Sequence, residues 1–448
     1  MLLSLRIVVR ITSTGGDVNP LGPKICCTAH LPLIPIPCRA EGNDGTQAKS
    51  RMITGRNGPR RLSIFGSTGS IGKNTLDVVK HLGGLENFEI SVLTGNENVD
   101  LLAQQARAAG AKLAVTASDS HYEALKSALS GSGIAVAAGQ SGLMEAADLE
   151  AEWVMAAIVG TAGLAPTLAA ARKGADIALA NKECLVSAGD LFVQSVRRGG
   201  GTLLPVDSEH NAIFQVLEEN QRHAVERIIL TASGGPFRNA SLEEMAGVTV
   251  ETARAHPNWS MGLKISIDSA SMFNKALEMI EAKHLFGLTP EQIEVIVHPQ
   301  SVIHSMVGYT DGSVLAQLGA PDMRTAIGYA LAHPRRPNLP IERLDFAKLA
   351  RLDFEAPDET RFPALRLARL AMTRGGVQGA VLNAAKEVAL EAFIAGRLSF
   401  LAMADVTETV MDQLAHLPEA ATMDDVFAVD KEARQRAAVL VASREKAA

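Results

Sequence analysis

Four short segments of the sequence combine acids, amines and hydroxyls at close spacing. They are residues 180–183, 205–209, 256–262 and 268–278. Carboxylate oxygens are hard ligands that suit Mg²⁺ or Mn²⁺, whereas serine, asparagine and lysine side chains donate hydrogen bonds to phosphate oxygens. Together the segments therefore predict a divalent-metal site beside a phosphate site.

The acidic pair Asp207 and Glu209 follows an expected strand at residues 202–206. In extended backbone, residues two apart point to the same side, so both carboxylates would face one metal ion. The alternative is an acidic pair that caps a helix beginning near Asn211, which is the commoner reason for such a pair. The Asp-Ser-Glu pattern alone does not decide between these interpretations.

A third acid comes from residues 268–278, where we expect the serines to open a helix. Asn274, Lys275 and Glu278 then fall on one face, at positions i, i+1 and i+4. That face suits a phosphate held by Ser269, Asn274 and Lys275, with Glu278 as a further metal ligand. A capped amphipathic surface helix with a Lys-Glu pair is the alternative.

Two loops add candidate binding groups. Residues 231–237 follow a strand and offer backbone N–H groups and the Ser233 hydroxyl, as in an anion-binding turn or an ordinary loop. Residues 256–262 contain Trp259, one of only two tryptophans. We expect this loop either to close over a substrate or to pack Trp259 against a neighbouring domain. Both interpretations stay open.

A glycine-rich turn at residues 66–72 lies between an expected strand, 62–65, and an expected helix, 74–81. Strand, turn and helix in this order predict a dinucleotide site, because the helix N-terminus attracts the pyrophosphate. The adenosine ribose would be read at residues 94–98. Glu97 stands there instead of a basic residue for a 2′-phosphate, so local charge does not favour NADP over NAD.

Composition limits the classes of partner. The chain has 448 residues, 43 basic and 49 acidic, with a formal net charge of −6. Without long basic blocks there is no electrostatic footprint for nucleic acid or an anionic membrane. No run of about 18 consecutive apolar residues predicts a transmembrane helix. A small-molecule ligand is the remaining expectation.

The order of expected elements predicts an α/β protein with several domains. Residues 60–206 alternate strands and helices, as in a Rossmann-like domain with a parallel sheet. Residues 207–332 contain longer strands, including a hairpin with its turn at 309–312, which predicts an α+β catalytic and dimerisation domain. We interpret residues 333–358 as a linker and residues 359–448 as a C-terminal helical bundle.

The first 59 residues carry five prolines between positions 20 and 37 and lack sustained periodicity. We expect a disordered extension there, either an organelle transit peptide or the result of translation assigned upstream of Met52. A bacterial cytoplasmic protein is the expectation, and a plastid location is the alternative if the extension is a transit peptide.

Taken in order, the motifs at 66–72, 180–183, 207–212, 233–238, 256–262 and 268–278 closely resemble the 1-deoxy-D-xylulose 5-phosphate reductoisomerase family. The similarity runs from about residue 61 to the C-terminus. It implies three domains, a homodimer, NADPH, and one Mg²⁺, Mn²⁺ or Co²⁺ per active site. The implied reaction cleaves and re-forms a C–C bond, then reduces the branched aldehyde to 2-C-methyl-D-erythritol 4-phosphate for non-mevalonate isoprenoid synthesis.

The resemblance also implies roles for individual residues. The metal ligands would be Asp207, Glu209 and Glu278, which together with Lys182 are the expected catalytic residues. The substrate would contact Lys182, Ser208, Glu209, Ser233, His256, Trp259, Met261, Ser269, Asn274, Lys275 and Glu278. The cofactor would contact Thr68, Gly69, Ser70, Ile71, Gly95, Asn96, Asn98, Asn181, Glu183 and Gly262. Departures from the family pattern are Glu97, Leu263 and Lys386, the last standing where relatives often have asparagine.

Two other functions fit part of the pattern. A metal-dependent NAD(P) dehydrogenase acting on a hydroxy acid would not need the phosphate group of Ser269, Asn274 and Lys275. A non-catalytic dinucleotide sensor would keep the 66–72 turn and tolerate the loss of Glu278.

Overall fold

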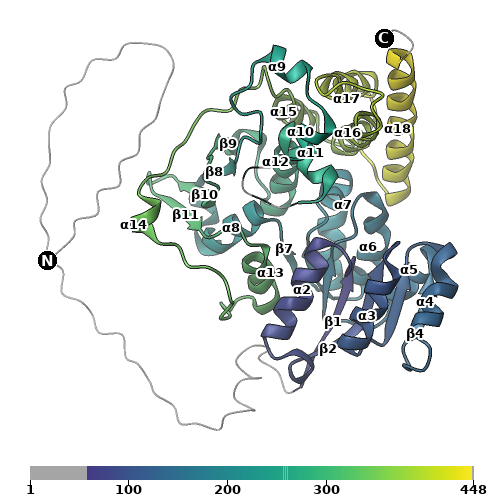
Figure 1. Cartoon of the computed structure of the whole chain (residues 1–448). Coiled ribbons are helices and arrows are strands. Elements are labelled where there is room, and N and C mark those ends of the chain that lie inside the picture. Colours follow the sequence, from purple (N-terminus) through teal and green to yellow (C-terminus); the bar gives the residue numbers. More distant parts are fainter. Residues whose placement is uncertain (1–57, 256, 258, 260, 446–448) are drawn as a thin grey trace, which may run out of the picture.

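The computed structural model describes residues 58–255, 257, 259 and 261–445 (Figure 1). The extension that we expect to be disordered lies almost wholly outside these residues, so that expectation stays a prediction. Within the described part of the chain, no helix is both long and apolar enough to cross a membrane.

A seven-stranded parallel sheet forms the first half of the protein. Its strands are β1 (Arg60–Phe65), β2 (Phe88–Gly95), β3 (Leu113–Thr116), β4 (Ala135–Ala138), β5 (Trp153–Ala156), β6 (Asp176–Leu179) and β7 (Leu203–Pro205). Their order is β4-β3-β2-β1-β5-β6-β7. The order therefore reverses between β1 and β5, and parallel sheets bind ligands at the carboxyl ends of strands beside such a reversal.

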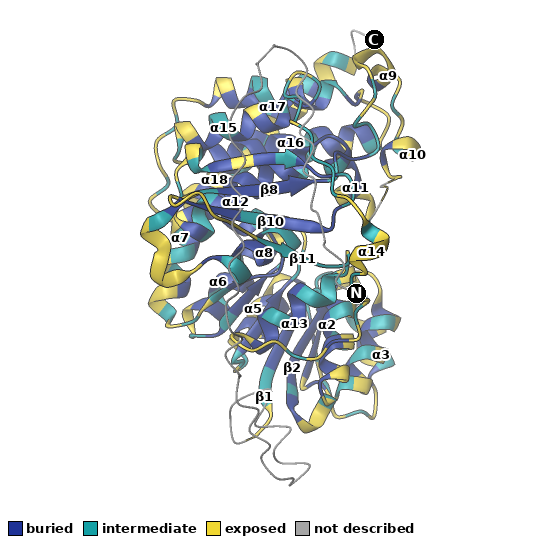
Figure 2. Cartoon of the chain, turned by 90° about the vertical axis from the view of Figure 1, so that its left-hand side faces the viewer, coloured by how far each residue is buried: buried dark blue, intermediate teal, exposed yellow. Residues whose placement is uncertain are grey.

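Helices cover the sheet, which explains why its strands are nearly continuous apolar runs. They are α2 (Ser70–His81), α3 (Val99–Ala109), α4 (Tyr122–Ala128), α5 (Gly139–Asp148), α6 (Leu164–Arg172) and α7 (Glu183–Gly199). Figure 2 shows the buried strands between helices whose outer faces are exposed. The predicted Rossmann-like alternation is confirmed. We did not anticipate β4 and α5, because residues 135–148 are rich in alanine and glycine and carry few strand-forming side chains.

A second, mixed sheet follows, in the order β11-β10-β8-β9. Its strands are β8 (Val225–Ala232), β9 (Ile293–Val297), β10 (Ile303–Tyr309) and β11 (Val314–Leu318). The predicted hairpin is present, since the Gly312 N–H donates to the Tyr309 carbonyl at 2.9 Å. The helices of this part are α8 (Ser208–Val216), α9 (Leu242–Ala246), α10 (Val250–Ala253), α11 (Leu263–Ala270), α12 (Phe273–Phe286) and α13 (Met323–Ala332).

The C-terminal region is helical, as the sequence predicts. It contains α15 (Ala364–Arg374), α16 (Gln378–Ile394), α17 (Ala402–Gln413) and α18 (Met423–Glu445), while the short helix α14 (Phe346–Leu349) lies within the predicted linker. Its apolar residues do not form a separate core. Ile280 of α12 belongs to the same buried cluster as Val381 of α16 and Val441 of α18. The catalytic part and the helical bundle therefore support each other directly.

Helix α13 packs back onto the parallel sheet. Ile327 and Leu331 belong to the same buried cluster as Leu62 and Trp153. The Trp153 side chain is fully buried, and its indole N–H donates to the Ala330 carbonyl at 3.2 Å. This contact joins the second half of the chain to the first at the amino end of β5.

Replacing Trp153 with alanine should lower the free energy of unfolding by about 3–5 kcal/mol, because the change leaves a cavity and an unpaired carbonyl. Denaturant unfolding would measure the loss. The control is Leu85→Ala, whose side chain is 58% exposed and should change stability by less than about 0.5 kcal/mol. Equal stabilities of the two variants would contradict a structural role for this contact.

Candidate active site

The predicted functional segments gather at the carboxyl edge of the parallel sheet. The glycine turn follows β1, residues 181–183 follow β6, and Asp207 follows β7. Because carboxyl ends of parallel strands meet at one edge, three segments far apart in sequence come close together. Helix α12 brings Glu278, Asn274 and Lys275 to the same place.

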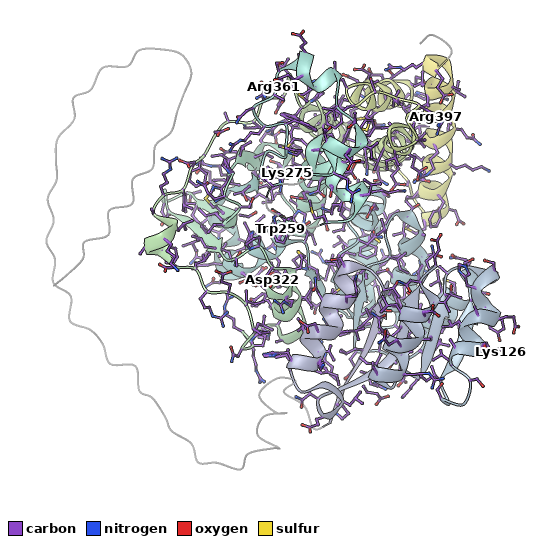
Figure 3. All side chains as sticks on the ribbon, in the orientation of Figure 1. Lys126, Trp259, Lys275, Asp322, Arg361 and Arg397 are labelled. Atoms are coloured by element: carbon purple, nitrogen blue, oxygen red, sulfur yellow. The ribbon has the colours of Figure 1, made fainter. Side chains whose placement is uncertain are left out.

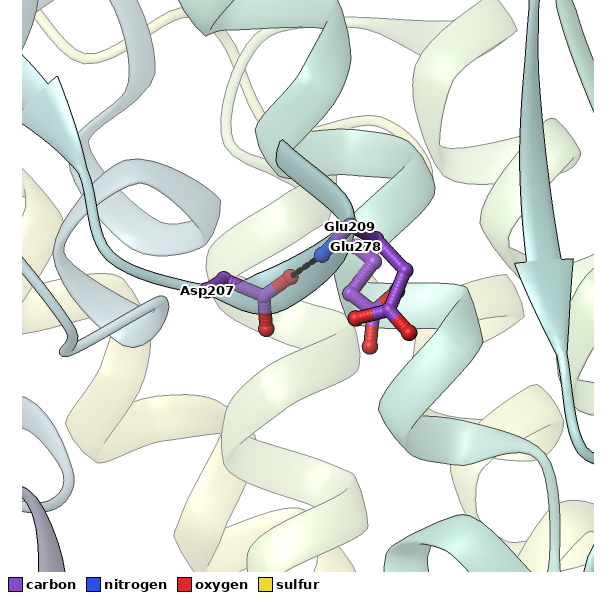
Figure 4. A group of neighbouring side chains, drawn as sticks. All are labelled: Asp207, Glu209 and Glu278. Atoms are coloured by element: carbon purple, nitrogen blue, oxygen red, sulfur yellow. Dashed lines mark hydrogen bonds between the residues drawn. The ribbon is translucent and has the colours of Figure 1, made fainter. Parts of the chain in front are cut away.

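Three carboxylates meet at this point. Asp207, Glu209 and Glu278 each offer an oxygen, and these oxygens all lie within 4.8 Å of one another (Figure 4). The expected extended backbone at residues 207–209 was wrong, because α8 begins at Ser208. Asp207 is its N-cap and accepts from the Glu209 N–H at 3.1 Å. The capping interpretation and the acidic cluster are thus both realised.

Two ammonium groups lie against the carboxylates. Lys182 Nζ is 3.0 Å from Asp207 Oδ2 and 3.5 Å from Glu278 Oε1. It also donates to Asn274 Oδ1 at 2.8 Å. Lys275 donates to Glu278 and lies 3.7 Å from Glu209 Oε1. Both lysine side chains are nearly fully buried, so their charges act at low dielectric.

The charges push the pKa values of two acids apart. Burial opposes ionisation of Asp207, but Lys182, His210 and Lys275 outweigh it and hold the pKa of Asp207 well below its usual range. Burial raises the pKa of Glu209 to about 8, against the attraction of Lys275 and with repulsion from Glu278. Asp207 is therefore held in its ionised form, whereas burial favours the protonated form of Glu209.

A buried pair that sequence reasoning missed lies behind the cluster. His210 and Glu281 are essentially inaccessible to solvent. His210 Nε2 donates to the Glu278 carbonyl at 2.9 Å, and His210 Nδ1 is 3.2 Å from Glu281 Oε2 and 3.5 Å from Asp207 Oδ1. Nδ1 and Oε2 are at ion-pair distance but too poorly aligned for a hydrogen bond.

The His210 side chain carries a positive charge at neutral pH. Despite burial, Glu281 and Asp207 raise the pKa of His210 to about 9. The available signals were adjacency to Glu209 and the i+3 spacing from Glu278.

The expected helix over residues 268–278 is two helices. Ser269 lies in the last turn of α11, and Met272, with φ +63°, separates it from α12. The expectation that the serines open the helix was therefore wrong. Asn274 and Lys275 do lie in the first turn of α12, and both donate to Glu278 one turn later.

Backbone packing brings the Ser233 turn to the end of α11. Gly235 has φ +65°, and its N–H donates to Ser233 Oγ at 3.1 Å. A Cβ at Gly235 would lie 3.2 Å from the Ser269 carbonyl oxygen and 3.1 Å from Ala270 Cα. The two predicted phosphate segments are therefore neighbours. Ser208, the other predicted hydroxyl, donates to Glu209 Oε2 at 2.6 Å.

The glycine turn is held by the next strand and leaves the first N–H groups of α2 uncapped. The Gly66 N–H donates to Thr94 Oγ1 at 2.9 Å, and a Cβ at Gly66 would lie 2.5 Å from the Ala157 carbonyl oxygen. Gly69 is the N-cap of α2 and, having no side chain, makes no cap hydrogen bond. Thr68, Ser70 and Ile71 complete this turn. Such a helix end suits an anion.

Several predicted cofactor residues also have structural roles. Asn98 caps α3 by accepting from the Leu101 N–H at 3.1 Å, while Gly95 ends β2 and the exposed Asn96 follows it. Asn181 donates to the Ile158 and Gly160 carbonyls. Glu183 accepts from the Gly160 N–H at 3.3 Å. Asn181 and Glu183 therefore hold the loop after β5.

Trp259 contacts the second sheet. Its ring centroid is 6.2 Å from that of His304 in β10, and Figure 3 labels it together with Lys275. This contact favours the packing interpretation without deciding between packing and a lid. Met261 and Gly262 are described, with Gly262 as the N-cap of α11. His256 lies outside the described residues, so its predicted role stays a prediction.

Comparison with known proteins agrees with this arrangement. Residues 62–189 match the profile for 1-deoxy-D-xylulose 5-phosphate reductoisomerase, and residues 203–286 and 318–436 match two C-terminal domains of that enzyme. The chain is 86% identical to the reductoisomerase of Rhizobium etli (strain CIAT 652) over 390 residues, covering 87% of this chain and 98% of the relative. The Rhizobium meliloti (strain 1021) enzyme is 74% identical over 390 residues, covering 87% of this chain and 100% of the relative.

The fold is also similar to solved structures of reductoisomerases. The Zymomonas mobilis reductoisomerase in complex with NADPH has a TM-score of 0.81 and 53% identity, over 86% of this chain and 99% of that one. A reductoisomerase in complex with NADPH, fosmidomycin and magnesium also has a TM-score of 0.81, with 41% identity over 85% of this chain and 98% of that one. The chain belongs to the 1-deoxy-D-xylulose 5-phosphate reductoisomerase family.

Proposed function

We infer that this protein converts 1-deoxy-D-xylulose 5-phosphate to 2-C-methyl-D-erythritol 4-phosphate with NADPH and a divalent metal ion. The observation that carries the inference is the convergence of Asp207, Glu209 and Glu278 beside Lys182 and Lys275. Relatives of high identity over nearly their whole length have this activity in their names.

The acidic cluster fits a metal ion by its donor chemistry. Three carboxylates supply the hard oxygens that Mg²⁺ or Mn²⁺ requires, and their oxygens lie within 4.8 Å of one another. Asp207, Glu209 and Glu278 would therefore be the ligands, and Co²⁺ is a further candidate. Bound there, the ion supplies Lewis-acid polarisation of the ketone and hydroxyl oxygens of the substrate.

Protein residues would do the rest of the positioning. Lys182 reaches the cluster and can donate a proton, or its charge, to a substrate oxygen on which negative charge develops. Ser233, Ser269, Asn274 and Lys275 would hold the phosphate, and Ser208 and His256 would contact the carbon chain. Trp259 and Met261 would exclude water. Holding the phosphate at one end fixes the reacting carbons at the other.

NADPH would lie along the carboxyl edge of the parallel sheet. The uncapped N-terminus of α2 suits its pyrophosphate, with Thr68, Gly69, Ser70 and Ile71 around it. Gly95, Asn96 and Asn98 would face the adenosine ribose. Asn181, Glu183 and Gly262 would complete the site towards the nicotinamide. NADPH supplies the hydride that reduces the rearranged aldehyde.

Assembly and location are part of the proposal. We propose a homodimer because β11 is an edge strand of the described sheet and exposes Val314 and Leu315, an edge that a second chain can cover. We propose a cytoplasmic location in bacteria, as for a metabolic enzyme with relatives in Rhizobium. Plastid import stays the alternative for the N-terminal extension.

The first test follows NADPH oxidation with 1-deoxy-D-xylulose 5-phosphate, with Mn²⁺ present or removed by excess EDTA. Turnover that requires both the metal and the substrate phosphate supports the proposal. A substrate without phosphate that reacts equally well would favour a hydroxy-acid dehydrogenase, and no turnover with metal present would favour a sensor.

Glu278→Gln should weaken Mn²⁺ binding and lower kcat/KM by about a hundredfold or more. Mutating a residue that only contacts a metal ligand already lowers metal affinity or activity by about ten- to a hundredfold. Electron paramagnetic resonance measures free Mn²⁺ independently of turnover. The control is Glu294→Gln, an exposed acid on β9, which should leave both quantities unchanged. Normal Mn²⁺ affinity in Glu278→Gln would remove Glu278 from the ligand set.

Glu97→Arg should raise the ratio of kcat/KM for NADPH to that for NADH by about tenfold, because a charge-assisted hydrogen bond replaces repulsion of the 2′-phosphate. Steady-state kinetics with both cofactors measure the ratio. Glu86→Arg adds the same charge at an exposed site of the same domain and is the control. An unchanged ratio would mean that residue 97 does not face the ribose.

Replacing Val314 and Leu315 together by lysine should shift the protein from dimer to monomer, because charged side chains block pairing at a sheet edge. Sedimentation velocity measures the change. Val439→Lys, at a residue 69% exposed on α18, controls for added charge. A variant that stays dimeric would place the interface elsewhere.

A further inference from the structure

A buried ion pair joins the C-terminal bundle to the proposed phosphate site. Lys386 of α16 donates from Nζ to Asp268 Oδ2 of α11 at 2.8 Å. The exposed fractions of the two side chains are only 4% and 11%. A buried ammonium without a partner is strongly unfavourable, so the geometry of this pair is tightly constrained.

Charged residues near Lys386 on α16 and α18 form a second set of contacts. Glu387, the next residue, receives hydrogen bonds from Arg434 of α18 and, at 3.4 Å, from Asn383. Burial opposes the charge of Lys386, but Asp268, Glu387 and Glu183 outweigh it and raise its pKa. The lysine is thus a buried cation balanced by acids of α7, α11 and α16.

The acceptor carboxylate belongs to the turn that carries a predicted phosphate ligand. Asp268 directly precedes Ser269, and α11 ends at Ala270. The Gly235 backbone of the Ser233 turn approaches Ser269 and Ala270 so closely that a Cβ there would lie 3.1–3.2 Å from them. A shift of the last turn of α11 would therefore displace both hydroxyl groups.

We propose that Lys386 is a positioning residue for substrate phosphate: its ion pair with Asp268 holds the end of α11 so that Ser269 and Ser233 face the phosphate. This inference rests on the proposed function, because it assumes that these serines bind the phosphate. The affinity of the active site for phosphate is then set partly by the C-terminal bundle.

The chain contains a matched control. Lys264 of α11 donates to Glu391 of α16 at 2.8 Å, so a second ion pair joins the same two helices. Its side chains are 53% and 55% exposed, and a solvated pair of this kind contributes little. Removing either lysine breaks one link between α11 and α16, but only Lys386 holds the turn next to Ser269.

The test compares Lys386→Met with Lys264→Met in the full-length enzyme with metal and NADPH present. The readouts are KM for the phosphorylated substrate, the inhibition constant of inorganic phosphate, and Tm. Lys386→Met should raise KM and the inhibition constant by roughly ten- to a hundredfold, the upper figure being the cost when a remote change misplaces a group by about 1 Å. Lys264→Met should change neither, and Lys386→Arg should restore most of the affinity.

The outcomes separate the possible failures. A lower Tm for Lys386→Met with unchanged phosphate inhibition would overturn the proposal and leave the pair a purely structural role. If Lys386→Met does not fold, Lys386→Gln, which keeps an N–H donor without the charge, carries the same comparison. No turnover of the phosphorylated substrate by the unmodified enzyme would instead contradict the proposed function.

Discussion

Crowding of buried carboxylates at the carboxyl edge of the parallel sheet is the constraint on which the rest of the site depends. Asp207, Glu209 and Glu278 repel one another at low dielectric, so cations must lie among them. Lys182 and Lys275 supply two positive charges, and His210 adds a third from behind. Buried Glu281, next to His210, is a fourth acid, so the four carboxylates outnumber the three cations. A site in this condition gains free energy when a dication binds, which links metal binding to the stability of the fold.

Each element around the cluster fixes one of its charges. Helix α8 begins at Ser208, and the N-cap hydrogen bonds of Asp207 fix the direction of that carboxylate. The left-handed backbone at Met272 ends α11 and allows a new helix, α12, to begin at Phe273. Asn274 and Lys275 therefore lie one turn from Glu278. At the opposite, amino edge of the parallel sheet, a Trp153–Ala330 hydrogen bond ties α13 to the sheet that positions Lys182. Local geometry and long-range packing are therefore both needed to bring the charges to one point.

Sequence reasoning succeeded where chemistry followed local periodicity. The alternation of residues 60–206 and the glycines at 66–72 were sufficient for the parallel sheet, and the spacing of Asn274, Lys275 and Glu278 gave their shared face. It failed where tertiary contacts determine the backbone conformation or the partner of a side chain. No glycine marks the left-handed residue at Met272, so one helix was expected instead of two. The pairing of His210 with Glu281 depends on the packing of α8 against α12. Adjacency to Glu209 and the i+3 spacing from Glu278 mark each residue singly, but they do not reveal the contact between them.

The partners of Lys386 also could not be predicted from the sequence. In the sequence it is a departure from the family pattern within an apolar helix, 118 residues from Asp268. Only the fold shows that its charge is balanced by three acids from α7, α11 and α16. Replacing this cation alone leaves buried carboxylates less compensated, so changes at position 386 and at its partners should have non-additive effects. The C-terminal bundle is thereby coupled to the electrostatics of the active site, although it contributes none of the predicted metal, phosphate or cofactor ligands.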